Sequence, residues 1–587
     1  MIDWIHPGLI FLVGALVLPA LKGRSQQIWL LVVPLAALAS VATMTEGDYG
    51  AFTFIGQNLL IGKVDKLALV FAWVFTIMAV IGLVYSLHVR NTAQHIGAFL
   101  YIGSALTVVF AGDWFTLLVG WEIMAFASAY LVFAANTVSA TRAGMRYLMV
   151  HITGGVLLLG GIILHGQETG SYLFGPIGET GGLAYTLILI AFIINAAVPP
   201  LNAWLTDAYP EATVTGAVFL SAFTTKTAIY VLIRAYPGTE LLVWLGAVMA
   251  LYGVIYAVLE NDCRRLLAYH IVSQVGYMVA GVGIGTEMAL NGSASHAFAH
   301  IIYKGLLFMG AGAVIHMTGR RKLTELGGLY RTMPLTVVLY MIGAFAISAF
   351  PLFSGFVTKS MVVAAAGGDH RAAIVLMLTI ASSGTFLHTG LKLPYYMFFG
   401  KDCGLRPSEP PANMLAAMSI AAILCIGIGV LPGVLYGLLP YPVDYHPYSG
   451  YHITESLSLL MFTALGFFLF LKYLDPERTI SLDTDWFYRR GAGLFMWIAS
   501  RPIARWEQMI SGISDTVIWR SLNFTANVSL VSDLKVVDAI VNGVARTALR
   551  CGAAMRKVQS GVVSHYAGAM IGGVLACIAL YVALWTG

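Results

Sequence analysis

Long apolar runs separated by short polar segments occupy most of this chain. A transmembrane helix needs about 20 consecutive apolar residues, and sixteen segments approach or exceed that length. They lie near residues 5–21, 27–45, 66–88, 95–112, 114–135, 142–165, 182–205, 212–235, 240–259, 265–284, 290–317, 333–363, 371–399, 412–435, 453–473 and 563–585. The pattern predicts an all-α polytopic membrane protein with about 16 transmembrane helices.

Two of these segments are interrupted by proline. In the seventh, Asn195 is followed by Pro199 and Pro200, and Pro351 divides the twelfth. Proline removes a helical hydrogen bond, and broken helices at corresponding places in two halves mark the ion site of many transporters. The two breaks lie five segments apart, which predicts an inverted repeat of segments 4–8 and 9–13. Residues 191–195 and 344–348 are faintly alike, at a level no better than chance.

The basic residues of the connecting loops indicate an orientation. Loops after odd-numbered segments hold thirteen of them, namely Lys22, Arg24, Arg90, Arg142, Arg146, Arg264, Arg265, Arg320, Arg321, Lys322, Arg331, Lys401 and Arg406. Loops after even-numbered segments hold four, namely Lys63, Lys66, Arg234 and Arg371. Because basic residues accumulate on the cytoplasmic side, both termini are predicted to be non-cytoplasmic.

Residues 483–562 have a different character, because charged and apolar residues alternate there. This region is too polar to span a bilayer and too apolar for a linker, so it predicts amphipathic helices along the cytoplasmic face, interrupted at Pro502 and near Gly512. About 75 helical residues would reach on the order of 110 Å. The region is either a surface anchor or a strap across neighbouring subunits, and residues 563–587 form the final span.

Composition agrees with this picture and limits the chemistry. The chain is 59% hydrophobic and 10% charged, with a mean hydropathy of +0.82. Its five cysteines form no CxxC pair, and no nucleotide-binding or haem motif is found, so we predict no metal, no cofactor and no nucleic-acid partner. We divide the chain into three N-terminal helices (1–94), a first half (95–236), a second half (237–400), helices 14–15 (401–482), the amphipathic region (483–562) and the final span (563–587).

The eleventh segment carries three titratable residues at helical spacing. His296, His300 and Lys304 are four residues apart, so each lies about 40° around the helix and about 6 Å further along it than the one before. Histidines paired in the core and a lysine reaching to the surface would be the plain interpretation. Three such groups at membrane depth are costly, however, and this favours a proton relay.

Five more charged or titratable residues lie inside predicted spans: Glu122, Lys226, His270, Lys359 and Lys392. Glu122 is expected to pair with Lys226 or with a neighbouring subunit, or else to be protonated. Lys359 lies beside the break of the twelfth span and is a candidate gate. His270 is either a relay group or a hydrogen-bonded structural histidine, and Lys392 either joins the relay or extends to the surface. Buried lysines of this kind can exchange protons near neutral pH.

Several motifs together resemble one family. They are Trp121-Glu122, Trp204-Leu-Thr-Asp207-Ala-Tyr-Pro, Lys226, Arg264-Arg-Leu-Leu-Ala-Tyr…Ser273-Gln-Val-Gly-Tyr277, His296…His300…Lys304 and Pro351-Leu-Phe-Ser-Gly-Phe…Lys359. Over roughly residues 60–435 the chain resembles the antiporter-like subunits of respiratory complex I, Mrp-type sodium/proton antiporters and membrane-bound hydrogenases, and the motifs of the core are most similar to the D-type subunits of the Mrp antiporters. The resemblance implies a prokaryotic inner-membrane location and a fourteen-helix core with two half-channels. It also implies proton-relay roles for Glu122, Lys226, His296, His300, Lys304 and Lys359.

Two departures from the family pattern affect the function. The family usually has a lysine at the seventh-helix break, where this chain has Asn195. The D-type subunits normally lack a lateral helix, whereas residues 541–566 resemble the end of that helix in the distal subunit of complex I. We therefore expect a proton-translocating subunit of a multisubunit cation/proton antiporter, with Na⁺ as a second candidate ion. The alternatives are a distal pump subunit of a redox complex and a structural strap with a degenerate channel.

Overall fold

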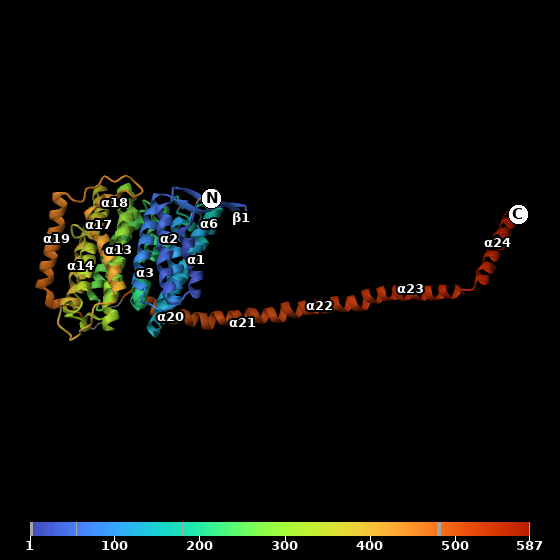
Figure 1. Ribbon diagram of the computed structural model, residues 1–587. Coiled ribbons are helices and arrows are strands. Elements are labelled where there is room, and N and C mark those ends of the chain that lie inside the picture. The colour runs from blue at the N-terminus through green and yellow to red at the C-terminus, as the bar shows by residue number, and fades with distance from the viewer. Residues whose placement is uncertain (1–3, 55, 179–180, 478–482, 586–587) are drawn as a thin grey trace. The chain divides into compact units, whose positions relative to one another are not determined.

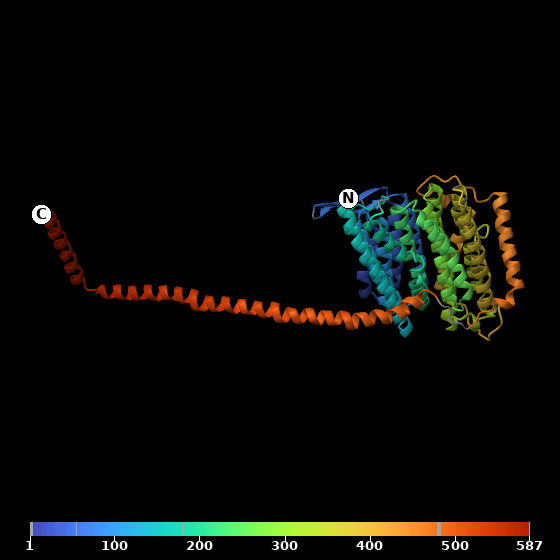
Figure 2. The same ribbon diagram turned by 180° about the vertical axis from the view of Figure 1, so that it is seen from behind.

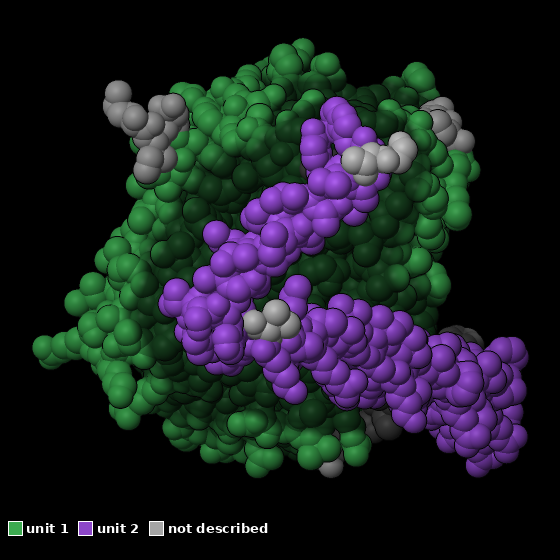
Figure 3. Space-filling model, turned by 90° about the vertical axis from the view of Figure 1, so that its right-hand side faces the viewer, with its two compact units in different colours: residues 1–487 green, residues 488–587 purple. Residues whose placement is uncertain are grey.

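A computed structural model describes residues 4–54, 56–178, 181–477 and 483–585, and most of them are helical (Figures 1 and 2). Two compact units, Met1–Phe487 and Tyr488–Gly587, are coloured separately in Figure 3. Within the described residues, thirteen helices are long and apolar enough to cross a membrane. Three shorter apolar helices, Pro7–Ala20, Leu183–Asn195 and Pro334–Ile347, fall in predicted spans. The prediction of a polytopic helical membrane protein is confirmed, and the number of crossing helices stays a prediction.

The part of the first unit before residue 236 contains ten helices of α type, two short 3₁₀ turns and a hairpin among its described residues. Its elements are α1 (Pro7–Val17), η1 (Leu18–Ala20), α2 (Arg24–Ala42), β1 (Gly47–Phe54), β2 (Gln57–Val64), α3 (Lys66–Ser86), α4 (Thr92–Phe110), α5 (Trp114–Phe133), α6 (Val138–Thr169), α7 (Leu183–Asn195), α8 (Ala203–Ala208), η2 (Tyr209–Glu211), α9 (Val214–Ala222) and α10 (Thr224–Ala235). The antiparallel hairpin, in which Gly47 pairs with Val64 and Phe54 with Gln57, was not predicted. Trp4 stacks on Tyr49 of its first strand at 5.2 Å between ring centroids.

The rest of the first unit follows the same helical plan. Its elements are α11 (Glu240–Leu259), α12 (Cys263–Ile284), α13 (Glu287–Thr318), η3 (Leu323–Glu325), η4 (Leu329–Arg331), α14 (Pro334–Ile347), α15 (Ser354–Gly368), α16 (Ala372–Thr385), the π-helical η5 (Phe386–Lys392) and η6 (Tyr395–Phe399), α17 (Ala412–Val430), α18 (Pro432–Tyr436), α19 (Gly450–Leu469) and η7 (Leu471–Tyr473). The apolar stretches of α9–α10 and α12 are entirely buried and that of α13 nearly so. The core therefore lies around the helices that carry the predicted site.

Short polar residues set where several of these helices begin. The carboxylate of Asp65 accepts a hydrogen bond from the N–H of Ala68, and that of Asp113 accepts one from Thr116. Such caps satisfy amide groups that have no partner inside the helix. At the other end, α6, α12 and α13 stop at glycines in the left-handed conformation, Gly170, Gly285 and Gly319.

The two predicted helix breaks are present and have the same backbone geometry. Beyond α7, Ala197 adopts a left-handed φ of 58°, and beyond α14, Ala349 adopts 57°. In both, the amide following that residue bonds a carbonyl five residues back: Val198 to Ile193 at 3.1 Å and Phe350 to Phe345 at 3.1 Å. The matched positions show that Asn195 corresponds to Ile347. The faint similarity of 191–195 with 344–348 was therefore off by one residue.

Two other predicted spans are less regular than expected. Residues 212–235 form two helices: α9 ends at Ala222 and α10 begins at Thr224. Residues 371–399 begin as α16 and continue as two π-helical stretches. A π-helical stretch carries a wider turn than an α-helix, and such turns are frequent at functional sites.

The C-terminal helices run end to end and are followed by one more apolar helix (Figure 1). They are α20 (Asp485–Ile498), η8 (Ala499–Ile503), α21 (Ala504–Ile513), η9 (Ser514–Trp519), α22 (Arg520–Ser532), η10 (Asp533–Val537), α23 (Asp538–Val558) and α24 (Val563–Trp585). The predicted interruptions at Pro502 and near Gly512 are wrong, because π-helical turns at 499–503 and 514–519 carry the helix onward. The predicted boundary at 482/483 falls on residues 478–482, which lie outside the described residues.

Candidate functional site

The predicted stripe of α13 lies on one fully buried face. The side chains of His296, His300 and Lys304 have no solvent exposure. The Nδ1 of His296 lies 3.2 Å from the hydroxyl of Thr358 on α15, and the rings of the two histidines are 6.2 Å apart. The Nζ of Lys304 lies 5.9 Å from the ring centroid of Phe308. The structure thus brings the three groups together and joins them to the second broken helix.

Several of the buried polar atoms have no hydrogen-bond partner among the residues that the structure describes. They include both ring nitrogens of His270, His300 and His388, and the Nζ of Lys304. Buried polar groups in folded proteins are normally paired, and leaving one unsatisfied costs about 1–3 kcal/mol. Free donors and acceptors at this depth are what a proton needs in order to pass from group to group.

Polar contacts extend sideways from the stripe. The hydroxyl of Tyr303 lies 3.5 Å from the Nε2 of His296 and 3.4 Å from the amide oxygen of Gln274 on α12. The Gln274 amide donates in turn to the hydroxyl of Thr385 at the end of α16, at 3.2 Å. Sequence reasoning missed Tyr303 and Thr385, because their contacts depend on how three helices pack.

The row of polar groups reaches Lys392 through a second histidine. The rings of His270 and His388 are 5.7 Å apart, and His388 belongs to the π-helical stretch that ends at Lys392. The Lys392 ammonium donates a hydrogen bond to the carbonyl of Val258 near the end of α11. Its side chain is buried, so Lys392 does not extend to the surface.

At the other end of the row, Lys359 lies beside the break between α14 and α15. Its Nζ donates to the carbonyl of Ile347, the last residue of α14, and to the hydroxyl of Ser382, both at 3.2 Å. The ammonium also lies 5.1 Å from the ring centroid of Tyr277. The break leaves the Ile347 carbonyl without a helical partner, and the C-terminal end of a helix attracts positive charge.

Lys226 is held in the same way in the first half. Its Nζ donates to the carbonyl of Ser221 at 2.6 Å, which is available because the helix breaks at Phe223. Neither proline nor glycine stands at this break, so the sequence offered no signal for it. Both buried lysines at breaks therefore have a helix end as their partner.

Glu122 is not paired with Lys226. Its side chain is half-buried on α5, and within the described residues no cationic group lies within 4 Å of its carboxylate. The carboxylate lies against α6 at Gly155, where a Cβ atom would overlap its Oε1. Of the three alternatives expected for Glu122, an ion pair with Lys226 is not found in this chain, which leaves a neighbouring subunit or protonation.

Asn195 has a partner, His151, that is not among the site residues predicted from the sequence. Its side-chain oxygen lies 2.9 Å from the Nδ1 of His151 on α6, and the His151 ring contacts the Trp204 ring at 4.6 Å between centroids. His151 lies one helical turn from Gly155, the residue that Glu122 contacts. The spacing of four residues puts His151 and Gly155 on one face of α6.

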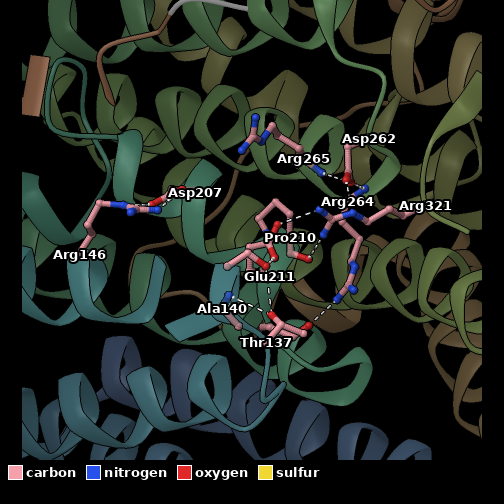
Figure 4. Close-up of polar contacts among 12 residues, drawn as sticks. Thr137, Ala140, Arg146, Asp207, Pro210, Glu211, Asp262, Arg264, Arg265 and Arg321 are labelled. Carbon is pink, nitrogen blue, oxygen red and sulfur yellow. Dashed lines mark hydrogen bonds and ion pairs between the residues drawn. The ribbon is translucent and has the colours of Figure 1, made fainter. Parts of the chain in front are cut away.

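Figure 4 shows an ionic network that ties the first half to the second. Arg321 contacts the carboxylates of Asp262 and Glu211, both at 2.9 Å. Glu211 also accepts a hydrogen bond from Ser139 at 2.6 Å, and Arg264 donates to the carbonyl of Ala212 at 2.8 Å. The network thus connects the loop after α13 and the start of α12 with the segment that follows the first break.

Electrostatics keep this network charged at neutral pH. Burial raises the pKa of Glu211. The hydrogen bond from Ser139 and the positive charge of Arg321 together lower it by more than that, so the pKa lies below its usual range. Arg146 adds a two-pronged contact to Asp207 at 2.6 and 2.9 Å. Glu211 is therefore a fixed negative charge in a clamp of ion pairs.

Asp483, which lies near the end of the first unit, is held by contacts inside that unit. The hydroxyls of Tyr252 on α11 and Tyr269 on α12 both donate to its buried carboxylate. The neighbouring Thr484 hydroxyl lies 3.3 Å from the side-chain oxygen of Asn202, just before α8. This attachment joins the chain that enters α20 to both halves of the unit.

These features define a class of protein: a polytopic helical membrane protein whose two broken helices border a buried row of lysines and histidines. Residues 111–386 match the family model described as NADH:quinone oxidoreductase/Mrp antiporter, TM, a range that includes every predicted site residue except Lys392. The predicted resemblance to antiporter-like subunits is confirmed.

Named relatives come from more than one kind of complex. The chain is 29% identical over 407 residues to the A/B subunit of a probable K(+)/H(+) antiporter of Rhizobium meliloti, a match that covers 62% of this chain and 40% of the relative. It is 28% identical over 415 residues to hydrogenase-4 component B of Escherichia coli, covering 63% of this chain and 62% of the relative. The chain thus matches less than two thirds of the length of either relative.

A solved structure shares the fold over almost the whole chain. A chain of the membrane-bound sulfane sulfur reductase, an archaeal respiratory membrane complex, superposes with a TM-score of 0.69. The superposition covers 98% of this chain and 100% of that chain at 21% sequence identity. The shared fold therefore extends beyond residues 111–386 and includes the C-terminal helices.

Proposed function

We propose that this chain is a proton-translocating subunit of a multisubunit membrane complex. The relatives named as antiporter subunits support ion translocation. In an antiporter, the proton would move in exchange for K⁺ or Na⁺. The chain itself supplies titratable side chains, and any coupled redox chemistry would belong to other subunits.

The observation that carries the proposal is the buried row of groups from Lys359 to Lys392. The contact between His296 and Thr358 and those from Tyr303 to Gln274 and Thr385 support a path across α15, α13, α12 and α16. Each member can accept or donate a proton or orient a neighbour that does. Lysines at the two ends would hold and release the proton as their surroundings change, because burial makes a lysine easier to deprotonate.

In the first half, we infer that His151 replaces the lysine usual at the seventh-helix break. An asparagine side chain cannot change charge, but its oxygen can fix the tautomer and orientation of the imidazole. Glu122, one turn away along α6, would exchange protons with His151. Lys226 would complete this half by joining it to Lys304 of the second half.

The remaining expectations belong to the same proposal. The functional halves would be residues 95–236 and 237–400, and residues 483–562 would strap neighbouring membrane subunits together. Both termini would be non-cytoplasmic and the amphipathic region cytoplasmic, in a prokaryotic inner membrane. The domains 1–94, 401–482 and 563–587 would anchor and frame the transport core.

A redox-driven complex is the second candidate. It is favoured by the fold shared with the sulfane sulfur reductase chain over 98% of this chain. Purification from native membranes decides between the two: flavin or iron–sulfur absorbance in the purified complex identifies a redox pump, and its absence with all subunits retained identifies an antiporter.

The relay itself is tested at Lys304. We expect Lys304→Ala to abolish proton movement in vesicles that contain the assembled complex, measured with a pH-sensitive dye. Lys304→Arg should be nearly as damaging, because a guanidinium holds its proton too tightly. The exposed Lys401→Ala is the matched control. Normal transport by both Lys304 variants would identify a structural strap with a degenerate channel.

A further inference from the structure

A cavity of about 650 Å³ opens beside Lys359, between α15, α16 and α19. Ser360 and Ser382 line it on the side of Lys359, and Tyr445, His452 and Glu455 line it on the other. By volume it has room for on the order of twenty water molecules. Tyr445, His446 and Ser449, from the segment between α18 and α19, also line it, and α18 lies at the top of the first unit in Figure 1.

Lys359 is the residue at which the cavity meets the buried row. Only 2% of its side chain is exposed, yet it forms part of the cavity wall and contacts Ser382, another wall residue, at 3.2 Å. A group that exchanges protons must alternate between a buried neighbour and water. Lys359 has Ile347 and the helix end on one side and this cavity on the other.

The opposite wall is built by α19, which lies outside the family match. The His452 ring stacks on Phe356 of α15 at 4.5 Å with an interplanar angle of 19°. Its Nδ1 lies 2.8 Å from the carbonyl of Pro447, a contact that leaves Nε2 free to accept a proton. These two contacts fix His452 within one helical turn of Lys359 along α15.

Glu455 lies one turn further along α19 and gives the wall a negative charge. Burial raises the pKa of the Tyr445 hydroxyl. The hydrogen bond with the Ser360 hydroxyl lowers this pKa, and the negative charge of Glu455 raises it. Ser360, Tyr445 and Glu455 all line the same cavity. A carboxylate in a cleft concentrates cations there and speeds their arrival by about 10- to 1,000-fold.

We propose that α19, α15 and α16 enclose a hydrated vestibule through which protons pass between Lys359 and the face that carries α18, with Glu455 collecting them. This inference rests on the proposed function of Lys359. The helix before the amphipathic region is then part of the transport path as well as a membrane anchor. A cavity filled by lipid chains is the competing outcome.

Thiol labelling tests the vestibule without measuring transport. In a full-length chain with the exposed Cys403, Cys551 and Cys577 replaced by serine, Ser456→Cys lies in the cavity wall. We expect a charged, membrane-impermeant methanethiosulfonate to label it in the assembled complex. The control Met461→Cys, 70% exposed on α19 and outside the cavity, should resist the reagent because that face meets lipid. Ser456→Cys that resists equally would overturn the vestibule.

Transport then tests Glu455. Glu455→Gln should slow proton movement by about tenfold, the low end of what charge in a cleft contributes, and Glu455→Asp should restore it. The exposed Glu287→Gln is the matched control at another helix start. If Glu455→Gln transports normally while Ser456→Cys is labelled, Glu455 is not the collector. If Lys304→Ala also transports normally, the relay fails and the labelling result still decides whether the vestibule is hydrated.

Discussion

The Nδ1 of His151 lies 2.9 Å from the side-chain oxygen of Asn195, at the first of two helix breaks with the same backbone geometry. The second break holds the ammonium of Lys359 at 3.2 Å from the Ile347 carbonyl. One half thus presents an imidazole at its break and the other an amine. Because an unperturbed imidazole gains its proton near pH 6.5 and an amine near pH 10.4, the two halves are chemically unequal.

If His151 carries protons, His151→Gln should separate its two roles. The glutamine amide can still bond to Asn195, but it cannot take up a proton. We expect proton movement to fall by about a hundredfold, the low end of what a positioned proton-transfer group contributes, while the complex assembles normally. Thr153→Val, on the same helix, is the control. Undiminished transport by His151→Gln would limit His151 to a structural role.

The close approach of Glu122 to Gly155 gives a second prediction. In Gly155→Ala the new Cβ would overlap the carboxylate, so Glu122 has to move away from α6. In Gly154→Ala the nearest atoms lie at 3.6–3.9 Å, an ordinary contact. We expect proton movement to fall markedly in the first variant and to stay unchanged in the second. Equal activities would show that the position of Glu122 against α6 does not matter.

The clamp at Glu211 should make stability depend on pH. Because the folded pKa of Glu211 is depressed, its contribution is complete above the unfolded pKa of about 4.3 and is lost as pH falls through the folded value. We expect Glu211→Gln to lower the free energy of unfolding by about 1–3 kcal/mol at pH 7, with the difference vanishing in strong acid. Thermal unfolding in detergent measures it, with Glu168→Gln as control. A difference that is constant with pH would contradict the clamp.

The contacts of Asp483 predict how the segment that leads into α20 is held. Asp483→Ala removes the acceptor of two tyrosine hydroxyls, whereas Tyr252→Phe removes one donor. We expect limited proteolysis to cut residues 483–487 faster in Asp483→Ala than in the wild type, with a smaller increase in Tyr252→Phe. Wild-type resistance of this segment in Asp483→Ala would show that other contacts hold it.

The parts of the fold set by local spacing could be predicted from the sequence. The stripe of His296, His300 and Lys304 follows from a repeat of four residues, and the breaks at Pro199 and Pro351 follow from the chemistry of proline. The region 483–562 followed from its alternation of charged and apolar residues. Each of these signals is contained within one helix.

Features that depend on the packing of separate helices could not be predicted. His151 meets Asn195 only because α6 and α7 are neighbours, and Tyr303 meets Gln274 only across α12 and α13. The break at Phe223 lies in a run of ordinary helix formers and threonines, so the local sequence does not predict it. The π-helical turn at Pro502 absorbs a residue that normally interrupts a helix, which explains the wrong prediction there.

The helix ends that hold Lys226 and Lys359 have one more consequence. If each lysine were paired with a carboxylate, that carboxylate would be left as an uncompensated buried charge whenever the lysine lost its proton or moved away. An uncompensated buried charge strongly destabilises the protein. The carbonyls of Ser221 and Ile347 carry only a partial charge, so each lysine can leave its partner without that penalty. Each break therefore binds its lysine only weakly, so a small change in the charge of neighbouring groups can move the lysine or its proton.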